Sequence, residues 1–123
     1  MLEAYSTNIS IGANANVPFN STSIQKGVTA TKPSADTINL NKCGVYMVAV
    51  DGSTATSTTL QLYKDGVALP QAQSTGLSPS FVTLVQVDHN NNDCCCTSPT
   101  TLQVKNTVAG TFTDVNITIT KVC

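Results

Sequence analysis

An almost unbroken apolar run, rich in β-branched residues, occupies residues 45–50 near the middle of the chain. A turn that ends at Gly44 precedes this run, and the pair Asp51-Gly52 closes it. A strand with one face in water alternates between apolar and polar residues, whereas this run has almost no polar position. The pattern therefore predicts a central strand covered on both faces. A similar run at residues 81–87 predicts a second buried strand.

Shorter segments of alternating apolar and polar residues surround these two runs. Turn-forming residues separate them at roughly 8–12-residue spacing, and no segment has a helical period. The pair Asp65-Gly66 between two apolar stretches is a strong signal for a tight hairpin. The spacing predicts an all-β sandwich that forms one domain over residues 1–123. The expected strands are 3–11, 24–31, 37–40, 44–50, 58–63, 67–69, 81–87, 100–106 and 115–122, with a Ser/Gly/Pro loop at 74–80.

Composition agrees with β structure and narrows the range of partners. Only 11% of the residues are charged, against about 25% in average soluble domains, so Thr, Ser, Asn and Gln must supply much of the polar surface. The formal net charge of −1 gives no electrostatic basis for binding nucleic acid or an anionic membrane. No apolar segment approaches the ~20 residues of a membrane-spanning helix, and no secretory signal is visible. We therefore expect synthesis in a cytoplasm, with no nucleic-acid or membrane partner.

Residue types that carry out catalysis are sparse and scattered. His89 is the only histidine and lies in a polar segment, and no cysteine is set apart as an activated nucleophile beside it. The 7 carboxylates mostly occupy expected turns, where Asp has a structural role. None of them adjoin in a way that suggests the acid/base pair of a glycoside hydrolase. The sequence therefore predicts a protein that is not an enzyme and has no catalytic residue, no metal and no cofactor.

The 5 cysteines leave three interpretations open. In the first, disulfides close long loops, and the odd count leaves one thiol unpaired or shared between subunits. In the second, the cysteines bind zinc or another soft metal together with His89, although Cys-x-x-Cys spacing is missing. In the third, the thiols stay reduced and pack as small buried groups. The residues concerned are Cys43, Cys94, Cys95, Cys96 and Cys123.

The order of several short motifs resembles that of a known family. Over residues 11–122 the chain resembles the TNF-like jelly roll, in the version found at the C-terminus of bacterial collagen-like surface proteins and in bacteriophage virion proteins. The resemblance implies a ten-stranded antiparallel jelly-roll sandwich that assembles as a homotrimer. The motifs that carry it are Gly44-Val45-Tyr46, Leu62-Tyr63-Lys64-Asp65-Gly66 and the alternating last strand at 115–122.

The resemblance also implies an arrangement of strands and cysteines. In the inner sheet of this family, the first strand, the last strand, the central strand and the strand at 81–87 are antiparallel neighbours. Cys43 would then open the central strand, Cys123 would end the last strand, and residues 94–96 would follow the strand at 81–87. The start of a strand lies beside the ends of its antiparallel neighbours. The resemblance therefore places all five thiols at one end of the domain.

The resemblance, together with the lack of a visible secretory signal, membrane span or catalytic motif in the sequence, predicts a trimeric structural module on the surface of a particle. The predicted role is that of a phage or prophage capsid decoration or head-fibre protein. The expected partners are further copies of the chain and a capsid or other virion or surface carrier. The outward face of the inner sheet, around Met47, is the expected trimer contact. The alternative is a receptor- or glycan-binding tip of a phage or bacterial surface appendage, which would use loops at 51–57 and 74–80.

Overall fold

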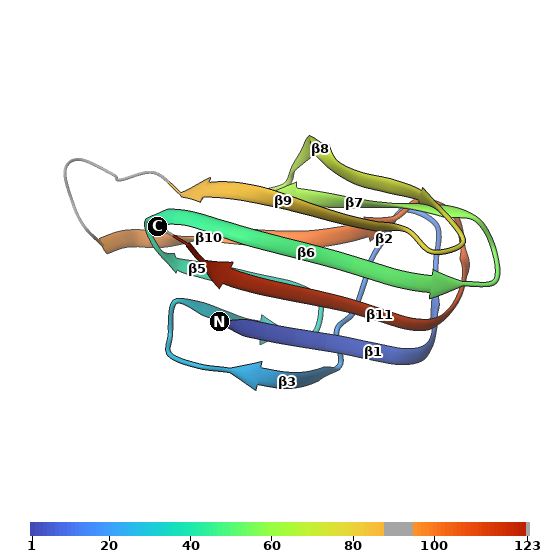
Figure 1. Cartoon of the computed structure of the whole chain (residues 1–123), viewed down its shortest axis with the longest axis horizontal. Coiled ribbons are helices and arrows are strands. Elements are labelled where there is room, and N and C mark those ends of the chain that lie inside the picture. Colours follow the sequence, from blue (N-terminus) through green and yellow to red (C-terminus); the bar gives the residue numbers. More distant parts are fainter. Residues whose placement is uncertain (88–94, 123) are drawn as a thin grey trace.

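The computed structural model describes residues 1–87 and 95–122, and for residues 95–99 it describes the backbone alone. Within these residues every regular element is a β-strand, and all strand pairs are antiparallel. The strands form two sheets that face each other (Figure 1). The all-β sandwich expected from the alternating pattern is confirmed.

The two sheets, here called sheet A and sheet B, have the strand order of a jelly roll. The order β1-β11-β6-β9 within sheet A is the one that the family resemblance implied. Ten of the strands described lie on the two main paths, and the two-residue strand β2 is an addition. Sheet A runs β3 (Ser21–Gln25), β1 (Leu2–Ile11), β11 (Gly110–Lys121), β6 (Gly44–Thr54) and β9 (Ser80–Val87). Sheet B runs β4 (Ala30–Ser34), β5 (Thr37–Lys42), β10 (Cys95–Asn106), β7 (Thr58–Lys64) and β8 (Val67–Gly76), and β2 (Ala15–Asn16) pairs with β10.

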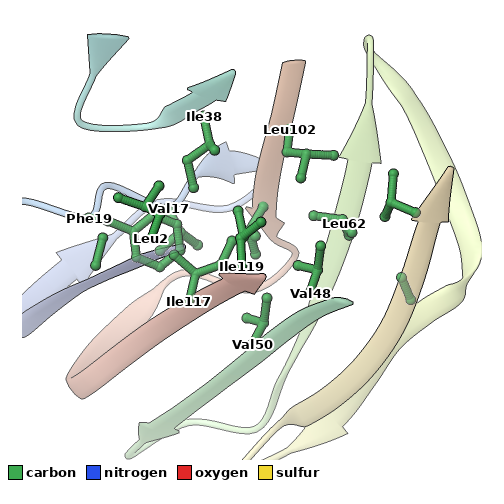
Figure 2. Packing of buried hydrophobic residues seen from close by; sticks show 14 of the residues in the cluster. Leu2, Val17, Phe19, Ile38, Val48, Val50, Leu62, Leu102, Ile117 and Ile119 are labelled. Carbon is green, nitrogen blue, oxygen red and sulfur yellow. The ribbon is translucent and has the colours of Figure 1, made fainter. Parts of the chain in front are cut away.

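The hydrophobic core fills the space between the two sheets (Figure 2). Alternate residues of each long strand point into it, because successive side chains of a strand lie on opposite faces. Burial of this apolar surface is the main favourable term in folding. The labelled core residues are Leu2, Val48, Val50, Ile117 and Ile119 of sheet A, Ile38, Leu62 and Leu102 of sheet B, and Val17 and Phe19 from the segment after β2.

The tight hairpin between β7 and β8 is confirmed. Asp65 and Gly66 both adopt the left-handed region, with φ values of 50° and 82°. Lys64 and Val67 form the closing cross-strand pair. Two consecutive left-handed residues are the requirement of a type I′ turn, which Asp-Gly satisfies at little steric cost.

The central strand β6 is buried on one face rather than two, so the prediction of coverage on both faces is wrong within a single chain. Tyr46, Val48 and Val50 are buried, whereas Met47 and Asp51 are exposed on the other face. The strand predicted as buried at 81–87 behaves in the same way. Both runs carry apolar residues on both faces, but the second sheet of the sandwich covers only one of them.

The strand β6 also continues past Gly52, where the sequence pattern placed its end. A Cβ atom at Gly52 would lie 3.2 Å from the ring of Phe112, so the missing side chain makes room for an aromatic ring. Glycine in a strand interior often marks such a close approach rather than a turn. Gly52 therefore helps to pack the core and does not end the strand.

Two other segment predictions were wrong for related reasons. Residues 24–31 form no single strand, because β3 ends at Gln25 and β4 begins at Ala30 in the other sheet. Gly27, with φ of 74°, lies in the connection between them. The strand β8 continues through Pro70 as far as Gly76, so only residues 77–79 connect it to β9. Proline is tolerated there because β8 is an edge strand, where one N–H can be missing from the ladder.

A buried polar side chain, Asn106, ties together four segments at the end of β10. Its side chain is fully buried. Its Nδ2 donates to the carbonyl of Val108 at 2.7 Å and to those of Ile11 and Gly12 at 3.4 Å. Its Oδ1 accepts a hydrogen bond from the Thr58 hydroxyl. A satisfied polar group of this kind fixes the relative positions of the segments it joins.

We expect Asn106→Ala to lower the free energy of unfolding by about 3 kcal/mol, because it removes the buried hydrogen bonds that the Asn106 side chain donates to three carbonyls and accepts from the Thr58 hydroxyl. Chemical denaturation monitored by circular dichroism measures this loss. The control Asn39→Ala lies on the solvent side of β5 and should cost less than about 1 kcal/mol. Equal losses in the two variants would contradict the role assigned to Asn106.

Asp36 holds the turn between β4 and β5. Burial raises the pKa of its carboxyl group, but hydrogen bonds donated by Thr37, Ser34 and Asn16, together with a backbone hydrogen bond, lower it by more, so the net pKa is lowered. The hydroxyls of Thr37 and Ser34 lie 3.1 Å from Oδ1, and Nδ2 of Asn16 lies 3.4 Å from Oδ2. The ionised carboxylate is therefore the form that the fold stabilises.

A lowered pKa in the folded state makes stability depend on pH in one direction. The contribution of Asp36 is fully present above the unfolded-state pKa of about 4 and is lost as the pH falls through the folded-state value. We therefore expect Asp36→Asn to lower the melting temperature at pH 7, with a difference from the parent protein that shrinks towards pH 2. The control Asp51→Asn removes an exposed carboxylate and should match the parent protein throughout. A difference for Asp36→Asn that does not vary with pH would contradict this account.

Candidate functional site

The outward face of sheet A carries a strip of apolar side chains on its last two strands. Val45, Met47 and Ala49 lie on β6, and Val82 and Leu84 lie on β9; we call these five residues the β6–β9 patch. Val82 is 66% exposed, Leu84 is 62% exposed and Met47 is 36% exposed. Large exposed apolar side chains that cluster in this way mark interaction surfaces.

The strand register brings the members of the patch into contact distance across the two strands. Met47 pairs with Leu84, and Ala49 pairs with Val82. On its other side β6 pairs with β11, where Thr120 lies opposite Met47 and Thr118 lies opposite Ala49. The patch is therefore bounded by threonines on one side and by the edge of the sheet on the other.

A depression with a volume of about 460 Å³ lies at one end of this patch. Its apolar lining includes the small side chain of Ala49 and the side chain of Val82. Ser80, Thr118 and Asp51 supply polar groups around it. The Asp51 side chain is exposed and makes no hydrogen bond or ion pair with any residue that the structure describes. The depression fits an apolar group with a polar or cationic end.

Neither metal-binding nor membrane-spanning features are found in the part of the chain that the structure describes. Across residues 1–87 and 100–122, no three His, Cys, Asp or Glu side chains lie close enough together to hold a metal ion. In the same described part, no helix is long and apolar enough to cross a membrane. His89 lies outside the described residues, so its predicted position in a polar loop stays a prediction.

The cysteine prediction can be followed only in part. Cys43 lies between β5 and β6, is half-buried and packs against the core. The backbone of Cys95 pairs with that of Lys42, and the N–H of Val122 donates to the carbonyl of Val45 at 2.8 Å. The described backbone thus brings the start of β10 and the end of β11 close to Cys43.

The rest of the cysteine cluster lies outside what the structure describes. Cys94 and Cys123 are outside the described residues, and so are the side chains of Cys95 and Cys96. Disulfide pairing and metal binding by the five cysteines therefore stay predictions.

The two loops predicted for the alternative function are shorter than expected. Only residues 55–57 and 77–79 lie outside the strands in these regions. The N–H of Thr54 donates to the carbonyl of Leu77 at 2.9 Å, so the two connections are neighbours. They lie at the end of the sandwich opposite the two chain termini (Figure 1).

Comparisons with known proteins bear on the fold. No family model matches the chain, and no curated protein matches it either. Among solved structures, the globular domain of zebrafish complement 1qA protein aligns with a TM-score of 0.75 at 10% identity, over 99% of this chain and 96% of that one. The structure of rabbit GITRL aligns with a TM-score of 0.64 at 12% identity, over 100% of this chain and 95% of that one. The chain has the TNF-like jelly-roll fold.

Of the residues in the β6–β9 patch, the sequence predicted only Met47 as part of an interaction surface. Met47 lies in the middle of the patch, and its expected role in a contact between subunits stays a prediction. Val82 and Leu84 were assigned to a buried strand. The signal that could have found them is the apolar run at 81–87 itself, because a strand in a sandwich of two sheets can bury only one of its faces.

Proposed function

We propose that this protein is a non-enzymatic structural module that assembles as a homotrimer on the surface of a particle, as a phage or prophage capsid decoration or head-fibre protein. The observation that carries the proposal is the β6–β9 patch. The family resemblance given by the sequence motifs supports the trimer, because the TNF-like family is homotrimeric, and it supports the particle, because bacteriophage virion proteins carry this version of the fold.

The energetics of the patch favour self-association. Burial of apolar surface contributes roughly 25 cal/mol for each Å² removed from water. Val82 and Leu84 are among the most exposed large hydrophobic side chains in the part of the chain that the structure describes. The patch lies on paired strands, so its backbone needs little ordering when a neighbour binds. Only 11% of the residues are charged, which leaves little electrostatic repulsion to keep copies apart.

The position of the β6–β9 patch is compatible with a cyclic trimer. It lies at one edge of sheet A, so three copies related by a threefold axis can each bring it towards the centre. Cyclic symmetry makes all copies point in the same direction. The three ends that carry the chain termini would then lie on one side of the trimer, where they can face a carrier.

We expect Val82→Glu to convert the assembly from a mass of three chains to a mass of one chain, because it places a charge in the buried contact. Light scattering with and without a reductant measures the mass. The matched control Val28→Glu changes a valine that is also 66% exposed but lies in the connection between β3 and β4, and it should leave the trimer intact.

Two results would contradict the proposal. A stable monomer of the unchanged protein in both conditions would exclude the trimer. A trimer that dissociates on reduction, with no effect of Val82→Glu, would assign the assembly to cysteines rather than to the patch.

The depression beside Asp51 favours one second candidate function, a receptor- or glycan-binding tip. It combines an apolar wall with hydroxyl and carboxylate groups, as ligand sites commonly do. The two candidates compete for one surface, because Ala49 and Val82 belong both to the patch and to the depression.

A glycan array tests this second candidate. If the depression binds a sugar, Ala49→Leu should abolish binding by filling it, whereas Ala13→Leu, on an exposed turn, should not. An array on which the unchanged protein has no ligand would count against the tip function.

A further inference from the structure

The depression at the end of the β6–β9 patch has an apolar part and a polar part that lie side by side. Ala49 of β6 and Val82 of β9 form one cross-strand pair, and Asp51 and Ser80 form the next outward-facing pair along the same two strands. Two residues along a strand cover about 7 Å, which is comparable with the size of one sugar ring. Thr118 of β11, which pairs with Ala49, adds a second hydroxyl group to the lining.

The polar groups of the depression are not used by the fold. The side chains of Ser80 and Thr118, like that of Asp51, make no hydrogen bond with any residue that the structure describes. A hydroxyl group can donate one hydrogen bond and accept others, whereas a carboxylate only accepts. The depression therefore offers a ligand two adaptable hydroxyls and one negatively charged acceptor.

A second carboxylate lies near Asp51. Asp51 pairs with Asn116 of β11, and Asp114, two residues away on β11, pairs with Ser53. Asp114 is thus a diagonal neighbour of Asp51, at about 7–8 Å between the Cα atoms. Asp114 also makes no hydrogen bond or ion pair with any residue that the structure describes. The two carboxylates give this part of sheet A a negative charge.

No lysine neutralises these carboxylates. The chain has no arginine, and its 6 lysines all lie within the described residues. Four of them lie on strands of sheet B, namely Lys32, Lys42, Lys64 and Lys105. The ammonium group of Lys64 reaches sheet A only at the carbonyl of Gln86, at the end of β9 remote from Ser80.

The remaining two lysines are also distant from the depression. The N–H of Lys26 donates to the carbonyl of Met1 at 2.9 Å, so Lys26 lies beside the N-terminus. Lys121 ends β11 and pairs with Tyr46, so roughly 17 Å of strand separates it from Asp51 at about 3.4 Å a residue. A positive charge next to Asp51 must therefore come from a ligand.

We infer that the depression binds an amino sugar, a glycan unit whose ring carries a protonated amine. The inference rests on the glycan-binding function proposed above as the second candidate, and it adds the charge of the ligand. Ala49 and Val82 contact the apolar C–H face of the ring. The hydroxyls of Ser80 and Thr118 bond to the hydroxyls of the sugar, and its ammonium group forms a charge-assisted hydrogen bond with Asp51.

Three other kinds of ligand fit the depression less well. An acidic sugar would bring its own carboxylate close to Asp51 and Asp114, and like charges at an interface repel each other. A neutral sugar would keep the hydroxyl contacts but would form no charge-assisted bond. The side chain of a lysine could reach Asp51, but its stem has no hydroxyl groups to bond with Ser80 and Thr118.

Isothermal titration calorimetry with the full chain tests the inference against four probes of matched length. An oligomer of glucosamine supplies the amine, and an oligomer of N-acetylglucosamine supplies a similar ring without the charge. An oligomer of galacturonic acid supplies the opposite charge, and an oligomer of lysine supplies ammonium groups without a ring. At low salt we expect the glucosamine oligomer to bind most tightly. Added salt should weaken its binding, because exposed charges are screened.

We expect Asp51→Asn to weaken binding of the glucosamine oligomer about tenfold, or about 1.4 kcal/mol, and to leave binding of the N-acetylglucosamine oligomer unchanged. The matched control Asp65→Asn removes the same charge from the turn between β7 and β8, where asparagine also tolerates the left-handed backbone. It should bind like the unchanged protein. Circular dichroism verifies that both variants are folded.

Several outcomes would overturn the inference while the glycan-binding function stands. These are equal binding of the glucosamine and N-acetylglucosamine oligomers by the unchanged protein, or equal losses in Asp51→Asn and Asp65→Asn. Tightest binding of the lysine oligomer would assign the depression to a protein ligand. If none of the three sugar oligomers binds, the amino-sugar inference is excluded, and the glycan array then decides whether any other glycan is a ligand.

Discussion

In a sandwich of two sheets, each sheet covers only one face of the other. This constraint determines which apolar residues are buried in the core and which stay exposed to solvent. In β6 and β9 the apolar residues occupy both faces, so the fold that buries Val48 and Val50 leaves Met47 and Leu84 in contact with solvent. The sheet cannot be turned to avoid this, because a shift of one residue in register would exchange the two faces and expose the core set instead. A second copy of the chain is the cover that the proposed trimer supplies.

Local sequence patterns predicted an element correctly where a single physical effect determines its structure. The Asp65-Gly66 turn follows from backbone sterics, and the alternation in β7 and β11 follows from the pleat. Local patterns gave a wrong prediction where a contact with a distant part of the chain determines the role of a residue. Gly52 looked like the end of a strand, but it faces the ring of Phe112, which no local pattern reveals.

The candidate sites were less predictable than the fold, because they depend on which strands are neighbours. Met47 could be placed on the outward face once the resemblance supplied a sheet order, but the pairing of Met47 with Leu84 requires the observed register.

The strand β9 also has a consequence for how the protein must be made. It is the last strand of sheet A, and from Ser80 to Val87 it contains neither a charge nor a proline, the two features with which natural proteins usually discourage unwanted pairing at a sheet edge. The ammonium group of Lys64, bound to the carbonyl of Gln86, blocks one position of that edge. A folded copy that leaves this edge open is therefore prone to aggregate. If the protein assembles as proposed, the balance between assembly and aggregation depends on the local concentration of further copies.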